Sequence, residues 1–137
     1  MGLILDSSLL IAGERQKQRV WDILERVKNS RGETENALSA ITIVELTHGI
    51  YRAKSEADRQ RRRAFVEELT DAIPVHPVTF EIAQLAGRIE GEQAAKGVVI
   101  ALPDLLIGVT ALHLGYSVAT LNVRHFQLIP GLSVIRL

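Results

Sequence analysis

Short aliphatic runs alternate along this chain with amphipathic helical stretches, and that alternation limits the possible folds more than any other feature. The first run, at residues 3–5, is continuous and aliphatic, as expected for a strand buried on both faces of a parallel sheet. Parallel strands need long connections, usually helices, which cross over in a right-handed sense. The pattern therefore predicts an α/β fold in which helices flank both faces of a central, mostly parallel sheet.

Hydrophobic spacing and turn signals give the expected elements. Strands are predicted at residues 3–5, 37–41, 75–76, 116–120 and 133–136. Helices are predicted from residue 9 and at residues 16–29, 42–53, 56–72, 79–96 and 105–114, with a turn or short helix at 122–126. No linker, repeat or low-complexity tract interrupts the pattern, so we expect one domain spanning residues 1–137.

Composition excludes several classes of protein. The 137 residues are 47% apolar, enough for a single core, and the absence of cysteine excludes a disulfide scaffold and thiolate metal sites. Neither a secretory signal nor a membrane-spanning run is visible, so we expect a cytoplasmic protein. Basic and acidic residues number 16 each, and only a local patch could therefore indicate nucleic-acid binding.

Three acidic residues stand in aliphatic surroundings at predicted junctions between elements. Asp6 ends the first strand, Glu45 lies in the first helical turn after the second strand, and Asp104 opens the helix at 105–114. The carboxyl ends of parallel strands share one edge of a sheet, where ligands usually bind. Each acid also has a structural interpretation: Asp6 as a helix N-cap, Glu45 as half of a capping box begun by Thr42, and Asp104 as a helix-start acid favoured by the macrodipole.

The aliphatic setting of these acids favours a metal site. An unpaired carboxylate buried among such residues would be costly, and a cluster of carboxylates repels itself unless a cation is present. Carboxylate oxygens suit Mg²⁺ or Mn²⁺. From the residues alone, a divalent-metal site and the three structural roles both remain open.

Four blocks of sequence, in this order, resemble the PIN-domain ribonucleases, in particular the VapC toxins of toxin–antitoxin pairs. The blocks are ILDSSLLIA at residues 4–12, SAITIVEL at 39–46, LPDLLI at 102–107, and ATLNVRHF at 119–126 followed by IPGL at 129–132. The resemblance covers nearly the whole chain. It implies a PIN-like fold and a Mg²⁺-dependent endoribonuclease, with Mn²⁺ as a possible substitute, that hydrolyses RNA phosphodiester bonds.

The resemblance also assigns roles to individual residues. It implies that Asp6, Glu45 and Asp104 hold the metal, and that Asn122 stands where the family commonly has a fourth catalytic acid. Predicted substrate contacts come from a second set of residues, namely Ser8, Thr120 and Arg124. A cognate VapB-type antitoxin and a homodimer are the implied protein partners. Because Asn122 departs from the family pattern, the alternative is a catalytically degraded PIN-like domain that serves as a binding or scaffold module.

One dense basic patch, formed by the arginines of residues 59–63 with Arg52 and Lys54 nearby, has three interpretations. It is a solvated helix face neutralised by neighbouring acids, a contact for RNA phosphates, or, as the resemblance suggests, a contact for the antitoxin. His125 stands where the family often carries an acid and is interpreted here as a surface turn residue.

Overall fold

The computed structural model describes residues 1–137 and contains one five-stranded sheet in the order β3-β2-β1-β4-β5, with every neighbouring pair parallel. The strands are β1 (Gly2–Leu5), β2 (Glu35–Ser39), β3 (Val75–His76), β4 (Ser117–Thr120) and β5 (Val134–Arg136). β1 lies at the centre, where Ile4 pairs with Ala37 of β2 and Val118 of β4. The predicted α/β class with a parallel sheet is confirmed.

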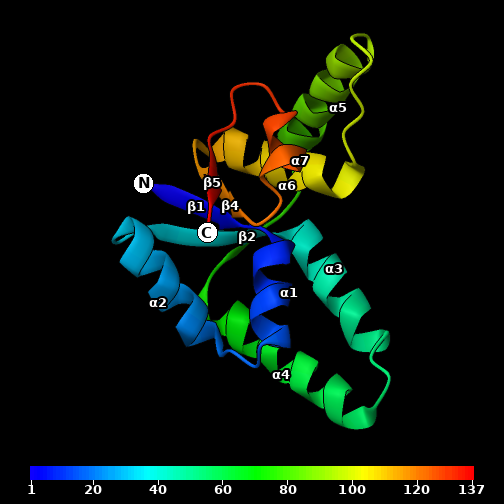
Figure 1. Cartoon of the computed structure of the whole chain (residues 1–137). Helices are drawn as coiled ribbons and strands as arrows, with labels where there is room; N and C mark the ends of the chain where they lie inside the picture. Colours follow the sequence, from blue (N-terminus) through cyan, green and yellow to red (C-terminus); the bar gives the residue numbers. More distant parts are fainter.

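Helices cover both faces of the sheet, as Figure 1 shows. They are α1 (Ser7–Arg15), α2 (Val20–Arg31), α3 (Ala40–Tyr51), α4 (Glu56–Ala72), α5 (Phe80–Ala94), α6 (Leu102–Leu114) and α7 (Val123–Gln127). In the figure, α1 to α4 lie on one side of the sheet and α5 to α7 on the other. None of these helices combines the length and the apolar character that crossing a bilayer requires.

Two apolar clusters, one on each face, hold the layers together. Leu3 and Leu5 of β1 belong to the cluster that includes residues of α1, α2 and α4, whereas Ile4 belongs to the cluster built with α5 and α6. This alternation follows from the period of two in a strand, since successive side chains point to opposite faces. β1 is fully buried on both faces and therefore fixes the position of whatever follows it.

The second strand and the helix after it differ from the prediction. β2 ends at Ser39, two residues earlier than expected, and Ser39 is the N-cap of α3, its hydroxyl accepting a hydrogen bond from the Ile41 amide. Thr42 lies inside the helix, and its buried hydroxyl has no hydrogen-bond partner. The predicted capping box of Thr42 and Glu45 was therefore wrong, because aliphatic Ala40 and Ile41 fit a buried helix start as well as a strand end.

Smaller differences occur at helix ends. α2 begins at Val20, not at residue 16, because a turn precedes it in which Lys17 has a positive φ of 60°. α5 begins after its N-cap Thr79 and ends at Ala94, close to the predicted helix at residues 79–96. Gly115 ends α6 with a φ of 72°, the left-handed conformation that glycine adopts at low cost.

Candidate metal-binding active site

Asp6 lies where β1 passes into α1, at the carboxyl edge of the sheet. Its backbone amide donates to the carbonyl of Ala119 in β4, and its side chain is only 2% exposed. Asp6 occupies the N-cap position of α1, yet its carboxylate makes no capping hydrogen bond. The carboxylate is directed instead toward side chains from other parts of the chain.

Two hydroxyls hold the Asp6 carboxylate. The Ser8 and Thr120 hydroxyls donate to the same carboxylate oxygen, Oδ2, over 2.6 and 2.8 Å. Each hydroxyl oxygen in turn accepts a backbone amide, that of Leu121 at 3.2 Å for Ser8 and that of Asn122 at 2.9 Å for Thr120. The amides thus direct both hydroxyl protons toward Asp6. The other oxygen, Oδ1, receives only a long contact of 3.5 Å from Ser7, and it remains available to a ligand.

Glu45 projects from the first half of α3 toward the same edge of the sheet. The Ser7 hydroxyl donates to Glu45 Oε1 at 2.9 Å, which links the acid of α3 to the start of α1. Burial raises the pKa of Glu45, the hydrogen bond from Ser7 opposes that rise, and the charges of Asp6 and Asp104 raise the pKa further. The carboxylate of Glu45 is thus electrostatically coupled to both other acids.

Asp104 comes from the first turn of α6 and faces the other two acids. Its Oδ2 lies 3.2 Å from Nδ1 of His125 in α7. Burial and the charge of Asp6 raise the pKa of Asp104, while His125 lowers it by charge and by hydrogen bonding. Mutual repulsion among acids is the condition that a bound cation relieves.

One pocket of about 490 Å³, the acid pocket, contains Asp6, Glu45 and Asp104 together with Asn122 and His125. As the side chains stand, no three His, Asp or Glu residues are close enough to form a preassembled metal site. The donor set nevertheless fits a hard divalent cation: three carboxylates share the pocket, two of them with raised pKa values, and Asn122, whose side chain carries an amide oxygen, also lines it. Asp6, Glu45 and Asp104 are thus the residues able to hold such an ion.

The three residues predicted to contact substrate lie in different environments. Ser8 lines the acid pocket, whereas Thr120 is fully buried, so its hydroxyl is available to Asp6 and not to a substrate in the pocket. Arg124 is exposed on α7 and does not line the acid pocket. Asn122 does line it, at the N-cap position of α7, and its side chain makes no capping bond.

Sequence reasoning missed the roles of two residues at this site. Ser7 joins Glu45 to the start of α1, and His125, interpreted from sequence as a surface turn residue, contacts Asp104. The only available signal for Ser7 was its position between Asp6 and Ser8. For His125 the signal was its place in the block that also carries Asn122.

The basic segment at residues 59–63 is largely paired within the chain. Arg59 pairs with Glu56, Arg61 pairs with both Glu14 and Asp58, and Arg62 donates to the carbonyl of Gly49. Of the three interpretations, the neutralised helix face thus accounts for most of this charge.

Known proteins resemble this chain over most of its length. The family model for the PIN domain matches residues 3–131. A relative described as ribonuclease VapC1 from Rickettsia felis is 33% identical over 135 residues, covering 98% of this chain and 96% of the relative. A tRNA(fMet)-specific endonuclease VapC from Salmonella typhimurium is 33% identical over 97 residues, 71% of each chain.

Solved structures show the same fold. A DNA-bound VapBC structure from Salmonella typhimurium contains a chain that aligns with a TM-score of 0.82 at 26% identity, covering 99% of this chain and 98% of that one. A VapBC-1 structure from nontypeable Haemophilus influenzae aligns with a TM-score of 0.79, also at 26% identity, over 98% and 96% of the two chains. The chain therefore belongs to the PIN-domain family, whose nucleases are generally metal-dependent, and within it to the VapC ribonucleases, the toxins of type II toxin–antitoxin systems.

Proposed function

We propose that this ribonuclease cleaves RNA at the acid pocket with Mg²⁺ held by Asp6, Glu45 and Asp104, and that Mn²⁺ can replace Mg²⁺. The observation that carries the proposal is the meeting of three acids in one pocket, where burial and neighbouring charge raise the pKa values of two of them. These acids come from the junction of β1 with α1, from α3 and from α6. Such an arrangement is unfavourable without a cation and becomes favourable with one. Residues 1–137 act in this proposal as a single domain.

The chemistry divides among the residues of the pocket. When bound, a divalent cation polarises a phosphoryl oxygen and lowers the pKa of a water molecule that attacks phosphorus. Oδ1 of Asp6 and the carboxylate of Asp104 face the pocket as ligands, and Glu45 orients the attacking water or completes the ligand set. The amide oxygen of Asn122 lines the same pocket and suits a weak ligand or a contact to water.

The hydroxyls act on the acids. Ser8 and Thr120 hold the carboxylate of Asp6, and Ser7 holds that of Glu45, so each hydroxyl positions one of the acids at the pocket. The proposal keeps a substrate contact for Ser8, which lines the pocket, and for Arg124, which neighbours the pocket residue His125 on α7.

The family supports a proposal for the partners and the location of this chain. The structural relatives are complexes described as VapBC, which supports inhibition of this chain by a cognate VapB-type antitoxin. Exposed apolar side chains on α3 and α5, namely Val44, Tyr51 and Phe80, support a homodimer. We place the enzyme in the cytoplasm, where RNA is available to it.

The test compares the wild-type protein with Asp6→Asn, each with Mg²⁺ and with chelator, on a labelled RNA substrate. We expect turnover only for the wild type with Mg²⁺. Thermal unfolding without RNA gives an independent readout, since Mg²⁺ at 100 times its Kd should stabilise the wild type by about 2.7 kcal/mol and Asp6→Asn by much less. Equal turnover in all four conditions would contradict the assignment of catalysis to these acids.

A further inference from the structure

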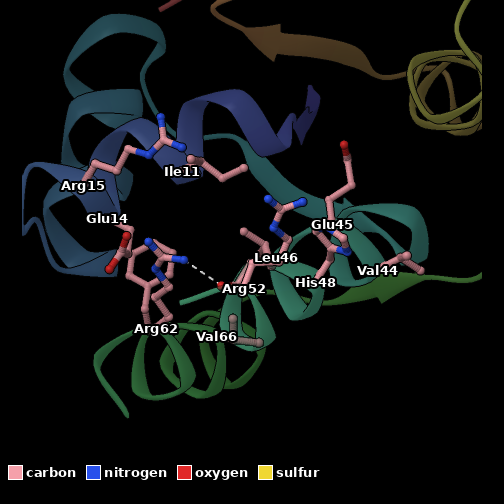
Figure 2. A pocket seen from close by; sticks show the side chains of 12 residues that line it. Ile11, Glu14, Arg15, Val44, Glu45, Leu46, His48, Arg52, Arg62 and Val66 are labelled. Atoms are coloured by element: carbon pink, nitrogen blue, oxygen red, sulfur yellow. Dashed lines mark hydrogen bonds between the residues drawn. The ribbon is translucent and has the colours of Figure 1, made fainter. Parts of the chain in front are cut away.

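A second cavity of about 580 Å³, the arginine groove, lies between α1, α3 and α4 and adjoins the acid pocket. Ile11, Arg15 and Glu45 line both cavities. Figure 2 shows Arg15 and Ile11 of α1 on one side of the groove and Glu45 and His48 of α3 on the other, with Arg62 coming from α4. A molecule seated at the acids can therefore continue into the groove without leaving the protein surface.

The arginines of the groove differ in whether they already have a partner within the chain. The guanidinium of Arg62 donates to the carbonyl of Gly49 at 2.6 Å, drawn as the dashed line in Figure 2. The side chains of Arg15 and Arg52 make neither an ion pair nor a hydrogen bond within the chain. Among the acids of the groove, Glu14 is already paired with Arg61 at 3.0 Å. The groove thus presents two unpaired guanidinium groups beside the pocket that is proposed to cleave RNA.

The remaining lining favours recognition of backbone over bases. Phe65 is the only phenyl, tyrosyl or indole ring in the groove, and at 8% exposure it is part of the core cluster, so the exposed imidazole of His48 is the one aromatic ring that the groove presents. Stacking on aromatic rings is the usual means by which proteins hold unpaired bases, whereas arginine binds phosphate with two parallel hydrogen bonds. The exposed donors here match phosphate oxygens.

We propose that Arg15 and Arg52 bind phosphates of the RNA strand that flank the scissile bond, so that the arginine groove holds the substrate backbone while the acid pocket cleaves it. The inference rests on the proposed function because it takes the acid pocket as the position of the scissile phosphate. It also shifts the expected RNA contact away from the arginines of residues 59–63 on α4. The contact comes instead from Arg15, the last residue of α1, and from Arg52, the residue after α3 that lies near that segment in the sequence. Arg15 and Arg52 are binding residues in this proposal and take no part in bond cleavage.

The test measures binding and cleavage separately. Arg15→Gln, Arg52→Gln and the double variant are made in the full chain. Arg31→Gln is the control, because Arg31 is exposed, makes neither an ion pair nor a side-chain hydrogen bond, and undergoes the same change in charge. Binding of a fluorescent single-stranded RNA is measured in the Asp6→Asn background, without metal, over a series of salt concentrations. Each groove arginine should reduce the slope of log K against log salt by about 0.7, and Arg31→Gln should not change it.

Cleavage gives the second readout. In the otherwise wild-type protein with Mg²⁺, each groove variant should raise KM about tenfold with little change in kcat, since a phosphate contact away from the reacting bond contributes equally to substrate and transition state. Unchanged salt slopes and KM would overturn the inference and leave the groove to a protein partner. Equal effects from Arg31→Gln would overturn it as well. If the wild type bound RNA with the expected slopes yet cleaved none, the proposed function would fail while the assignment of the groove to RNA would stand.

Discussion

The acid pocket and the arginine-rich start of α4 hold their charges in opposite ways. In the pocket, Glu45 and Asp104 have raised pKa values and share the cavity with Asp6, and the side chain of His125, beside Asp104, is the only basic side chain within ion-pair distance of these acids. On α4, Arg59 and Arg61 each pair with an acid one turn earlier in the same helix. One region keeps like charges together, and the other neutralises its charges internally.

This difference separates charge that serves folding from charge that serves function. An internally paired arginine needs no ligand, whereas acids that raise one another's pKa destabilise the free protein and are relieved by a cation. The number of charges in a segment is a poor guide to function, because in the densest basic run of the sequence Arg59 and Arg61 are both paired with acids. Of the two unpaired arginines of the groove, Arg15 lies far from that run in the sequence and Arg52 lies shortly before it.

The largest expected effect comes from removing one acid of the pocket. Loss of a residue that only orients a metal ligand typically reduces activity roughly 10- to 100-fold. Asp104→Asn should reduce turnover by more than this, because Asp104 is itself a proposed metal ligand. The same substitution should stabilise the metal-free protein by about 0.5–2 kcal/mol, a common gain for one stabilising change. Turnover on labelled RNA and denaturant unfolding with chelator measure the two effects. A variant that loses both activity and stability would show that Asp104 is structural.

The gain in stability should also depend on pH. The pKa of Asp104 is higher in the folded protein than in the unfolded chain, so between the two pKa values only the folded protein keeps the proton. The folded protein therefore loses stability relative to the unfolded chain as pH rises from the unfolded to the folded pKa. The difference in unfolding free energy between Asp104→Asn and the wild type should therefore be small near pH 4 and grow toward neutrality. A difference that is constant with pH would contradict the raised pKa of Asp104.

A smaller effect is expected from the hydroxyl that joins two of the acids. Ser7→Ala removes the hydrogen bond to Glu45, and loss of such a supporting contact typically weakens metal affinity by about 10- to 100-fold. Ser55→Ala is the matched control, because the Ser55 hydroxyl accepts the Asp58 amide as the N-cap of α4, away from the acids. Each variant is titrated with Mg²⁺, and binding is measured as the rise in Tm. Ser7→Ala should bind Mg²⁺ more weakly than the wild type, and Ser55→Ala should bind it equally well. If both variants bound Mg²⁺ like the wild type, Ser7 would not position Glu45.

The sequence predicted the sheet and the three acids better than it predicted what holds the acids. β1 and α4 match the expected elements closely, since a continuous aliphatic run and a long helical stripe are strong periodic signals. The start of α3 was misplaced, because aliphatic residues there satisfy either a strand or a helix. The bond from Ser7 to Glu45 spans 38 positions, and no local pattern encodes which hydroxyl such an acid will find. The ion pair between Arg61 and Glu14 could not be predicted either, since the two residues are distant in the sequence.

The smallest effects should come from the arginines of α4, and they test whether paired charge is structural. Arg59→Gln removes an ion pair on the protein surface, so we expect activity to be unchanged and the Tm to stay within about 2 °C of the wild type. Arg61→Gln should lower the Tm by roughly 4 °C or more, because it leaves the carboxylate of Glu14, only 10% exposed, without its partner. Neither variant should change the salt dependence of RNA binding. A reduced salt slope for Arg59→Gln or Arg61→Gln would return the basic segment of α4 to the RNA-binding surface and remove the contrast between α4 and the acid pocket.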